Sequence, residues 1–143
     1  MSDDWLIYHE EPITLHSGGK SHWFVDGQRI FNDPHLRESV LACWERYIFY
    51  PALTHLIAIP RGGISWAKAF ADRIGATWGL PDDVIPGNPR YVYAVDDVMT
   101  TGASLKSVKC NGSFVVIARR GVFFKPEMIA WAWIDLELEE AAS

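Results

Sequence analysis

The chain has 143 residues and a net charge of −5, and its 49% hydrophobic and 22% charged residues are ordinary for a globular protein. This length predicts one domain that covers residues 1–143 and buries a sizeable core. The negative charge argues against a general nucleic-acid-binding protein, which would need a basic face. No apolar run reaches membrane-spanning length, and the acidic start of the chain is unlike a secretory signal.

Cysteine and tryptophan usage adds two expectations. Cys43 and Cys110 stand far apart without the spacing of metal ligands, which is typical of inert packing residues in a reducing, cytoplasmic compartment. Seven Trp residues in this length predict either a strongly aromatic core or an aromatic contact surface.

Residues 14–26 predict a β-hairpin, with a strand to His16, a Gly-Gly turn and a return strand over 23–25. Its Gly-Lys-Ser at 19–21 is not the end of a nucleotide-binding P-loop, because that motif needs a glycine where Thr14 stands. A flat base needs a stacking face, and an anionic base needs a cation. The candidates are Lys20, Trp23 and Phe24. The alternative is an ordinary hairpin whose aromatic side chains pack in the core.

An amphipathic helix is predicted from Pro34 to about Phe49. Asp33 is suited to cap its first turn, and Pro51 ends it. One face of this helix is apolar and serves packing, through Leu36, Val40, Leu41, Trp44, Tyr47 and Ile48.

The next unit is a buried strand over 56–59, a turn over 60–63 and a helix over 64–74 that Gly75 ends. The turn contains Arg61, Gly62 and Gly63. Glycines let backbone N–H groups approach an anion, and arginine adds a fixed positive charge. Such a turn alone is weak evidence, but it lies one strand-helix unit before the segment described next. Between them, residues 76–90 hold three prolines and predict a stiff surface connection.

Residues 91–104 predict a buried strand, two adjacent acids at its carboxyl end, and a small hydroxyl-rich turn that opens a helix. Asp96 and Asp97 can accept hydrogen bonds from sugar hydroxyls. The turn can bind a phosphate through its N–H groups, its hydroxyls and the helix N-terminus. It comprises Thr100, Thr101, Gly102, Ala103 and Ser104. The sequence therefore predicts a sugar-phosphate site, and the alternative is a strand that ends in a solvated acidic turn.

The remaining chain predicts a short helix over 105–109, a buried strand over 114–118 and a final strand over 128–136. Arg119 follows the first of these strands at its carboxyl end, where α/β proteins place ligand groups. The alternative is a surface arginine.

The segment 91–104 resembles the motif with which type I phosphoribosyltransferases bind 5-phosphoribosyl-1-pyrophosphate (PRPP), and 14–34 resembles the N-terminal hairpin of orotate phosphoribosyltransferases. The resemblance implies an α/β fold with a mainly parallel sheet flanked by helices, a hairpin hood over 13–31 and a core over 36–136. It assigns the ribose hydroxyls to the acid pair, the 5-phosphate to 100–104, pyrophosphate to 61–63, and the base to Lys20, Trp23, Phe24 and Arg119. In this family the turn at 60–63 often carries a strained non-proline peptide.

The implied reaction is that of a pentosyltransferase, a glycosyltransferase that joins PRPP to a nucleobase, first of all orotate. Mg²⁺ is the implied cofactor, bound by pyrophosphate and ribose oxygens with Asp96 and Asp97 contributing indirectly. Members of the family commonly pair, so a homodimer is implied as well.

The resemblance fails at 76–90. The related enzymes carry a Lys-rich mobile loop there, whereas this chain offers Arg90 as its one cation. A PRPP- or nucleotide-sensing protein without turnover is therefore the alternative, and an unrelated nucleotide-binding α/β domain is a third.

Overall fold

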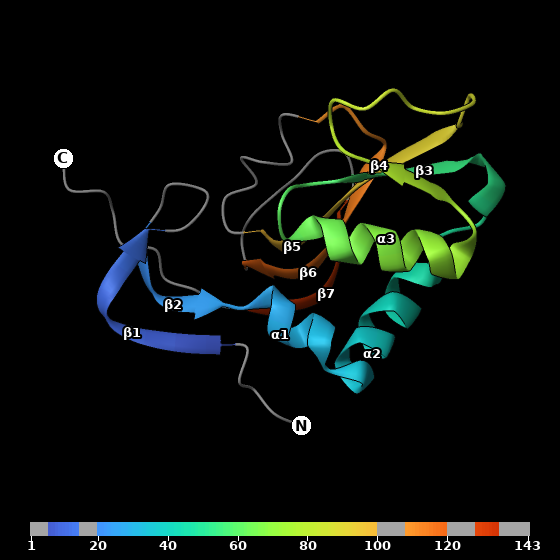
Figure 1. Cartoon of the computed structure of the whole chain (residues 1–143). Coiled ribbons are helices and arrows are strands. Elements are labelled where there is room, and N and C mark those ends of the chain that lie inside the picture. The colour runs from blue at the N-terminus through green and yellow to red at the C-terminus, as the bar shows by residue number, and fades with distance from the viewer. Residues whose placement is uncertain (1–5, 15–19, 100–107, 120–127, 135–143) are drawn as a thin grey trace.

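The structure is a computed structural model that describes residues 6–14, 20–99, 108–119 and 128–134 (Figure 1). Its elements follow the chain in the order β1 (Leu6–Thr14), β2 (Lys20–Val25), α1 (Gly27–Asn32), α2 (Pro34–Glu45), the short 3₁₀ helix η1 (Pro51–Leu53), β3 (Thr54–Ala58), α3 (Gly63–Ile74), β4 (Thr77–Gly79), β5 (Tyr91–Met99), β6 (Gly112–Arg119) and β7 (Met128–Ile134).

A five-stranded sheet in the order β4-β3-β5-β6-β7 forms the centre of the molecule, and each adjacent pair of strands is parallel. The middle of each inner strand is apolar, as expected of strands that are buried on both faces. Every residue of β3 is buried. The predicted α/β class with a mainly parallel sheet is confirmed.

The main core lies between the sheet and three helices, α1, α2 and α3, which Figure 1 shows on one side of the sheet. Trp44 of α2 is fully buried at its centre, with ring centroids 5.7 Å from Trp66, 5.4 Å from Phe70 and 5.8 Å from Phe114. Its indole N–H donates to the Val115 carbonyl oxygen at 3.2 Å, so one side chain joins α2 to the middle of the sheet. Much of the tryptophan content therefore serves packing.

The predicted hairpin is present as β1 and β2, an antiparallel pair that stands beside the main sheet (Figure 1). Its first strand is longer than expected, because it begins at Leu6 in a segment that lacks a clear alternating pattern. The register shifts between Tyr8 and Ile13, where the pairing moves from Trp23 to Ser21. Such an irregularity bends a strand and increases its twist.

Helix α2 begins as predicted, with the Asp33 carboxylate accepting from the backbone N–H groups of His35 at 3.0 Å and Leu36 at 3.2 Å. It ends at Glu45 and not near Phe49. Tyr47, which was expected on the packed face, is 47% exposed, because the chain leaves the helical path after Arg46. Helix α3 matches its prediction, and Gly75 ends it in the left-handed conformation at φ 75°.

Besides the three-residue η1, two elements were not predicted. The first is α1, which begins after the cap residue Asp26. The second is β4, an edge strand inside the connection that had been expected to be irregular. The short helix expected at 105–109 falls mostly outside the described residues, and its last two residues, Val108 and Lys109, are not helical.

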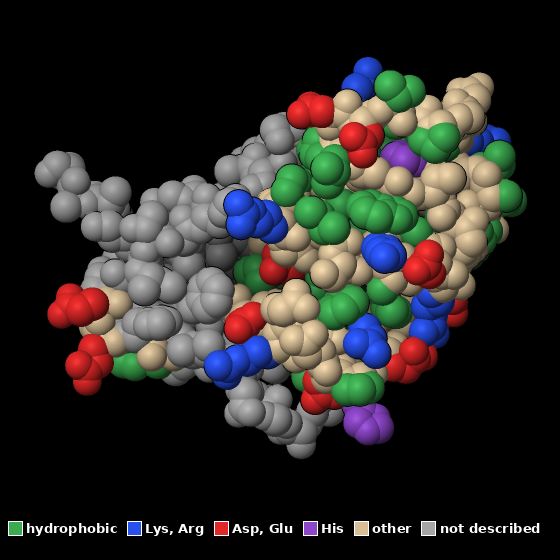
Figure 2. Space-filling view, in the orientation of Figure 1, with side chains coloured by type: hydrophobic (Ala, Val, Ile, Leu, Met, Phe, Trp, Pro, Cys, Tyr) green, Lys and Arg blue, Asp and Glu red, His purple; other side chains and the backbone are tan. Residues whose placement is uncertain are grey.

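The described surface carries no broad field of one charge sign on the face shown in Figure 2, where basic and acidic side chains are interspersed. None of the described helices combines the length and the apolar character needed to cross a bilayer.

Candidate functional site

The candidate site lies where the carboxyl ends of β3 and β5 separate. The two strands pair as far as Ala58 opposite Val95, and the Ile59 N–H then donates to the Val95 carbonyl oxygen at 2.9 Å. Beyond that point the chain turns away from the sheet toward α3. Strand β5 continues alongside β6 as far as Met99 opposite Ala118. The acid pair therefore lies on the strand itself. The sequence had indicated that it follows the end of the strand.

Asp96 is buried, with 8% of its surface exposed. Side chains alternate between the two faces of a strand, so Asp96 leaves β5 on the same face as Ala94. This face carries a second apolar cluster, formed by Ile59, Ala94, Val115 and Ala118. One carboxylate oxygen of Asp96 accepts from the backbone N–H of Asp97 at 2.8 Å.

The pKa of Asp96 is raised well above its ordinary value. Burial is the largest cause, followed by the neighbouring charge of Asp97. The two acids therefore differ in character, because Asp96 is buried and holds its proton to higher pH than an exposed carboxyl would, while Asp97 lies in a partly exposed position. A protonated carboxyl can donate a hydrogen bond, whereas an ionised one only accepts.

Asp97 leaves β5 on the opposite face, toward the helices. Its Oδ1 accepts from the backbone N–H of Val98 at 2.8 Å. Two glycines border the rest of the carboxyl group. A Cβ added to Gly27 would lie 2.6 Å from Asp97 Oδ2, and a Cβ added to Gly62 would overlap the same carboxyl group. The side chain of Asp97 therefore occupies a space that exists because residues 27 and 62 have no side chains.

The turn before α3 approaches β5 closely. The peptide bond between Pro60 and Arg61 is cis, at the position where the resemblance implied an unusual peptide. The N–H of Gly63 donates to the Ile59 carbonyl oxygen at 2.9 Å, and a Cβ added to Gly63 would overlap the Val95 carbonyl oxygen. Gly63 is thus required by packing against β5, although the sequence suggested it for anion contact. The side chain of Arg61 is exposed.

The structure brings together some of the predicted site residues, namely Asp96, Asp97, Gly62 and Gly63. Lys20, Trp23 and Phe24 are in β2 and Arg119 ends β6, but their side chains are not among those described. The predicted phosphate turn, comprising Thr100, Thr101, Gly102, Ala103 and Ser104, lies outside the described residues.

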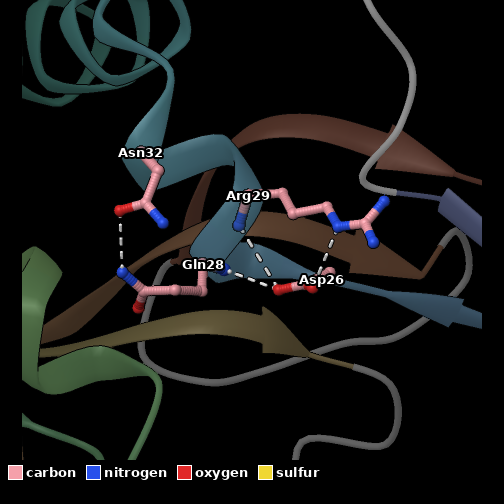
Figure 3. Close-up of polar contacts among 4 residues, drawn as sticks. All are labelled: Asp26, Gln28, Arg29 and Asn32. Atoms are coloured by element: carbon pink, nitrogen blue, oxygen red, sulfur yellow. Dashed lines mark hydrogen bonds and ion pairs between the residues drawn. The ribbon is translucent and has the colours of Figure 1, made fainter.

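Sequence reasoning missed Gly27. It opens α1, and Asp26 caps that helix by accepting from the N–H groups of Gln28 at 3.1 Å and Arg29 at 3.3 Å (Figure 3). Asp26 is a residue type that often caps a helix, and this could have indicated a helix start. Nothing in the sequence indicates that Gly27 meets Asp97.

The described residues do not form a metal site on their own, since no three His, Cys, Asp or Glu side chains gather among them. Two adjacent carboxyls that leave opposite faces of a strand are a poor chelating pair, and Asp96 is buried. Mg²⁺ is often bound through one or two carboxylates together with substrate phosphates and water. The residues present fit that kind of ion, with Asp97 as the available protein ligand.

Comparisons with known proteins place the fold. No protein-family model matches the chain, and no curated protein sequence matches it significantly. Among solved structures, it is similar to orotate phosphoribosyltransferase from Aeropyrum pernix, with a TM-score of 0.67 and 21% identity over 91% of this chain and 89% of that one. It is also similar to adenine phosphoribosyltransferase from Rhodothermus marinus, with a TM-score of 0.64 and 12% identity over 90% and 93% of the two chains.

A third similar structure is UMP synthase from Leishmania donovani, with a TM-score of 0.65 and 16% identity. The match covers 92% of this chain but 34% of that longer one. The chain therefore has the fold of the type I phosphoribosyltransferases, with a structural neighbour among the orotate enzymes as the sequence suggested.

Proposed function

We propose that this protein is a phosphoribosyltransferase that joins PRPP to a nucleobase and releases pyrophosphate. The observation that carries the proposal is the meeting of the Asp96-Asp97 pair on β5 with the glycine turn before α3, at the carboxyl end of a parallel sheet. Ligands of open α/β sheets bind at that edge. The similar solved structures share the fold at low identity and are named as orotate and adenine phosphoribosyltransferases.

The acid pair takes the ribose end of PRPP. Asp97 is partly exposed and accepts hydrogen bonds from the ribose hydroxyls, whereas Asp96 is buried on the other face of the strand. The 5-phosphate is assigned to the turn of Thr100, Thr101, Gly102, Ala103 and Ser104, and pyrophosphate to Arg61, Gly62 and Gly63. Arg61 is exposed beside this edge, where its guanidinium can pair with a phosphate.

The base is assigned to the hairpin and to the end of β6, through Lys20, Trp23, Phe24 and Arg119. Orotate is the first base to test, because its carboxylate suits two cationic side chains. Adenine is the second, because adenine phosphoribosyltransferases are among the similar structures.

In the reaction, a ring nitrogen of the base loses its proton to solvent and forms a bond to C1 of the ribose while the bond from C1 to the pyrophosphate oxygen breaks, with inversion at C1. Pyrophosphate leaves with the electron pair. Mg²⁺, when bound, would have Asp97 as its protein ligand and would neutralise charge on the leaving pyrophosphate. The protein orients the ribose through Asp97 and binds the 5-phosphate and the pyrophosphate at separate places. This holds C1 in position for the base nitrogen.

The test is a panel of nucleobases with PRPP and Mg²⁺, in which pyrophosphate release and PRPP binding are both measured. We expect one base to release pyrophosphate in proportion to nucleotide formed. Replacing Asp97→Asn should weaken PRPP binding about tenfold to a hundredfold, because hydrogen bonds to a charged group are lost. Asp72→Asn, which removes an exposed acid on α3, is the matched control and should leave binding unchanged.

A specific observation favours a second function, that of a PRPP sensor without turnover. The connection between β4 and β5 supplies one cation, Arg90, and its guanidinium lies 5.7 Å from the ring centroid of Tyr91 at the start of β5. That is the opposite end of the strand from the acids. PRPP binding without pyrophosphate release from any base would establish the sensor. A chain that fails to bind PRPP would contradict both functions and favour an unrelated nucleotide-binding domain.

A further inference from the structure

We propose that Gly27 is a positioning residue, whose lack of a side chain lets Asp97 hold the ribose of PRPP. The inference rests on the proposed function for its ligand, but its structural part can be tested without one. It concerns the point where the hairpin joins the core.

The contact is specific to one side chain. For a Cβ added to Gly27, the three nearest atoms all belong to Asp97, with Oδ2 at 2.6 Å, Cβ at 2.7 Å and Cγ at 3.0 Å. Carbon atoms that are not bonded to each other pack at about 3.5–4.0 Å. The backbone conformation does not require glycine, because Gly27 is not among the described residues with positive φ. The requirement for glycine is one of space alone.

Helix α1 cannot easily shift to relieve such a contact. Figure 3 shows Asp26 accepting from two N–H groups of the first turn, and its Oδ2 also lies 3.4 Å from Arg29 Nε. A further hydrogen bond of 3.1 Å joins the side chains of Gln28 and Asn32. On the inner side, Ile30 is fully buried in the core. These polar contacts stiffen the helix itself, and the buried Ile30 anchors it to the core.

Asp97 is equally confined on its other sides. Its Oδ1 accepts from the N–H of Val98, and the Gly62 backbone also borders the carboxyl group. A methyl group at position 27 would meet a carboxylate that cannot move toward Gly62 and that would have to leave its hydrogen bond to rotate. Placement errors of about 1 Å at a reacting centre can cost a hundredfold in rate.

This arrangement also links the sites proposed for the two substrates. Strand β2, which carries the candidate base-binding positions, ends at the buried Val25, and Gly27 follows two residues later. Gly27 therefore fixes how closely the base-binding hairpin approaches the acid that is assigned to the ribose.

The first test measures thermal unfolding of Gly27→Ala in three backgrounds, namely the wild type, Asp97→Ala and Asp97→Gly. In the wild type we expect Gly27→Ala to lower Tm by about 5 °C or more, because overpacking a confined site is destabilising. Asp97→Ala keeps the Cβ that would lie 2.7 Å away and should relieve only part of this loss. Asp97→Gly removes all three contacting atoms, so Gly27→Ala should then be neutral or raise Tm, as alanine favours a helix.

The second test measures the affinity for PRPP with Mg²⁺ by calorimetry. Gly27→Ala should weaken binding about tenfold or more and should have no further effect when Asp97 is already alanine, because both changes act on one carboxylate. The control is Gly75→Ala, which strains a left-handed residue with no atom near its added Cβ. It should lower Tm while leaving PRPP affinity within about twofold.

The proposal is overturned if Gly27→Ala destabilises the chain equally in all three backgrounds, or if it binds PRPP like the wild type. If Gly27→Ala does not fold, the double variant with Asp97→Gly decides the matter, since its recovery supports the proposal and its failure contradicts it. A wild-type chain that does not bind PRPP would instead remove the proposed function, and the pattern of Tm values would still show whether Gly27 positions Asp97.

Discussion

The packing of Trp44 yields a prediction that compares two tryptophans. Both indole groups connect α2 with the sheet through one hydrogen bond. Trp44 donates to the Val115 carbonyl oxygen at 3.2 Å in the fully buried core, and Trp131 of β7 donates to the Ser39 hydroxyl at 3.0 Å near the surface. Replacing each by phenylalanine removes the same atoms from different surroundings.

For Trp44→Phe we expect a loss of about 2–4 kcal/mol. A net hydrogen bond contributes about 1 kcal/mol, and the volume left by the smaller ring among Trp66, Phe70 and Phe114 adds about 1–3 kcal/mol, because a confined core relaxes only in part. Trp131→Phe should cost less than about 1 kcal/mol, because water can replace its bond to the exposed Ser39. The free energy of unfolding in urea measures both.

Equal losses for the two variants would refute the reasoning, since they would show that burial does not decide the cost. A second readout concerns the site. Val115 pairs with Asp96 across β5 and β6, so loosening the core at Trp44 should also weaken PRPP binding, whereas Trp131→Phe should not.

Three further predictions concern single groups. Gly63→Ala should lower the free energy of unfolding in urea by about 2 kcal/mol or more, because overlap with the Val95 carbonyl outweighs the better helix propensity of alanine, about 1 kcal/mol. A variant as stable as the wild type would contradict this and would show that β5 can shift to make room. Burial and the Asp97 charge raise the pKa of Asp96, so the folded chain binds the extra proton, and stability falls as pH rises from the ordinary value of 3.8 through the raised pKa. Asp96→Asn should remove that fall and be more stable than wild type at neutral pH, and a stability difference that does not change with pH would contradict this. Burial lowers the pKa of His55, so its contribution to stability is complete above pH 6.5 and is lost as the pH falls below that value. We expect His55→Gln to remove this loss, as measured by urea unfolding at several pH values. An unchanged dependence of stability on pH below 6.5 would contradict the assignment.

The sequence predicted the elements whose signals are local. The cap at Asp33, the apolar run that became β3 and the Gly75 end of α3 each depend on a few neighbouring residues, and each was found. The end of α2 was placed too late because Tyr47 and Ile48 continue the helical spacing, although the chain has already left the helix. Periodicity alone cannot detect that departure.

The contacts that build the site could not be predicted in the same way. Gly27, Gly62 and Asp97 meet because three separate elements converge, and no spacing in the sequence records that meeting. The motif at 91–104 identified the acids by resemblance, but it placed them after the strand. Pairing with β6 carries the strand on through Met99, and this depends on a partner that lies further along the chain.

The burial of Asp96 bears on the simplest alternative for the acid pair, a strand that ends in a solvated acidic turn. Such a turn would leave both carboxylates in water with ordinary pKa values, whereas Asp96 is 8% exposed and its pKa is raised. A buried carboxyl beside a second one costs stability, and an apolar residue of similar size would avoid that cost. Groups with strongly shifted pKa values gather at functional sites. Gly62 and Gly27 also leave room for the neighbouring Asp97. Positions 27, 62 and 96 therefore all lack the apolar side chain that would pack best there. Stability alone does not favour that arrangement, whereas the binding of sugar hydroxyls would.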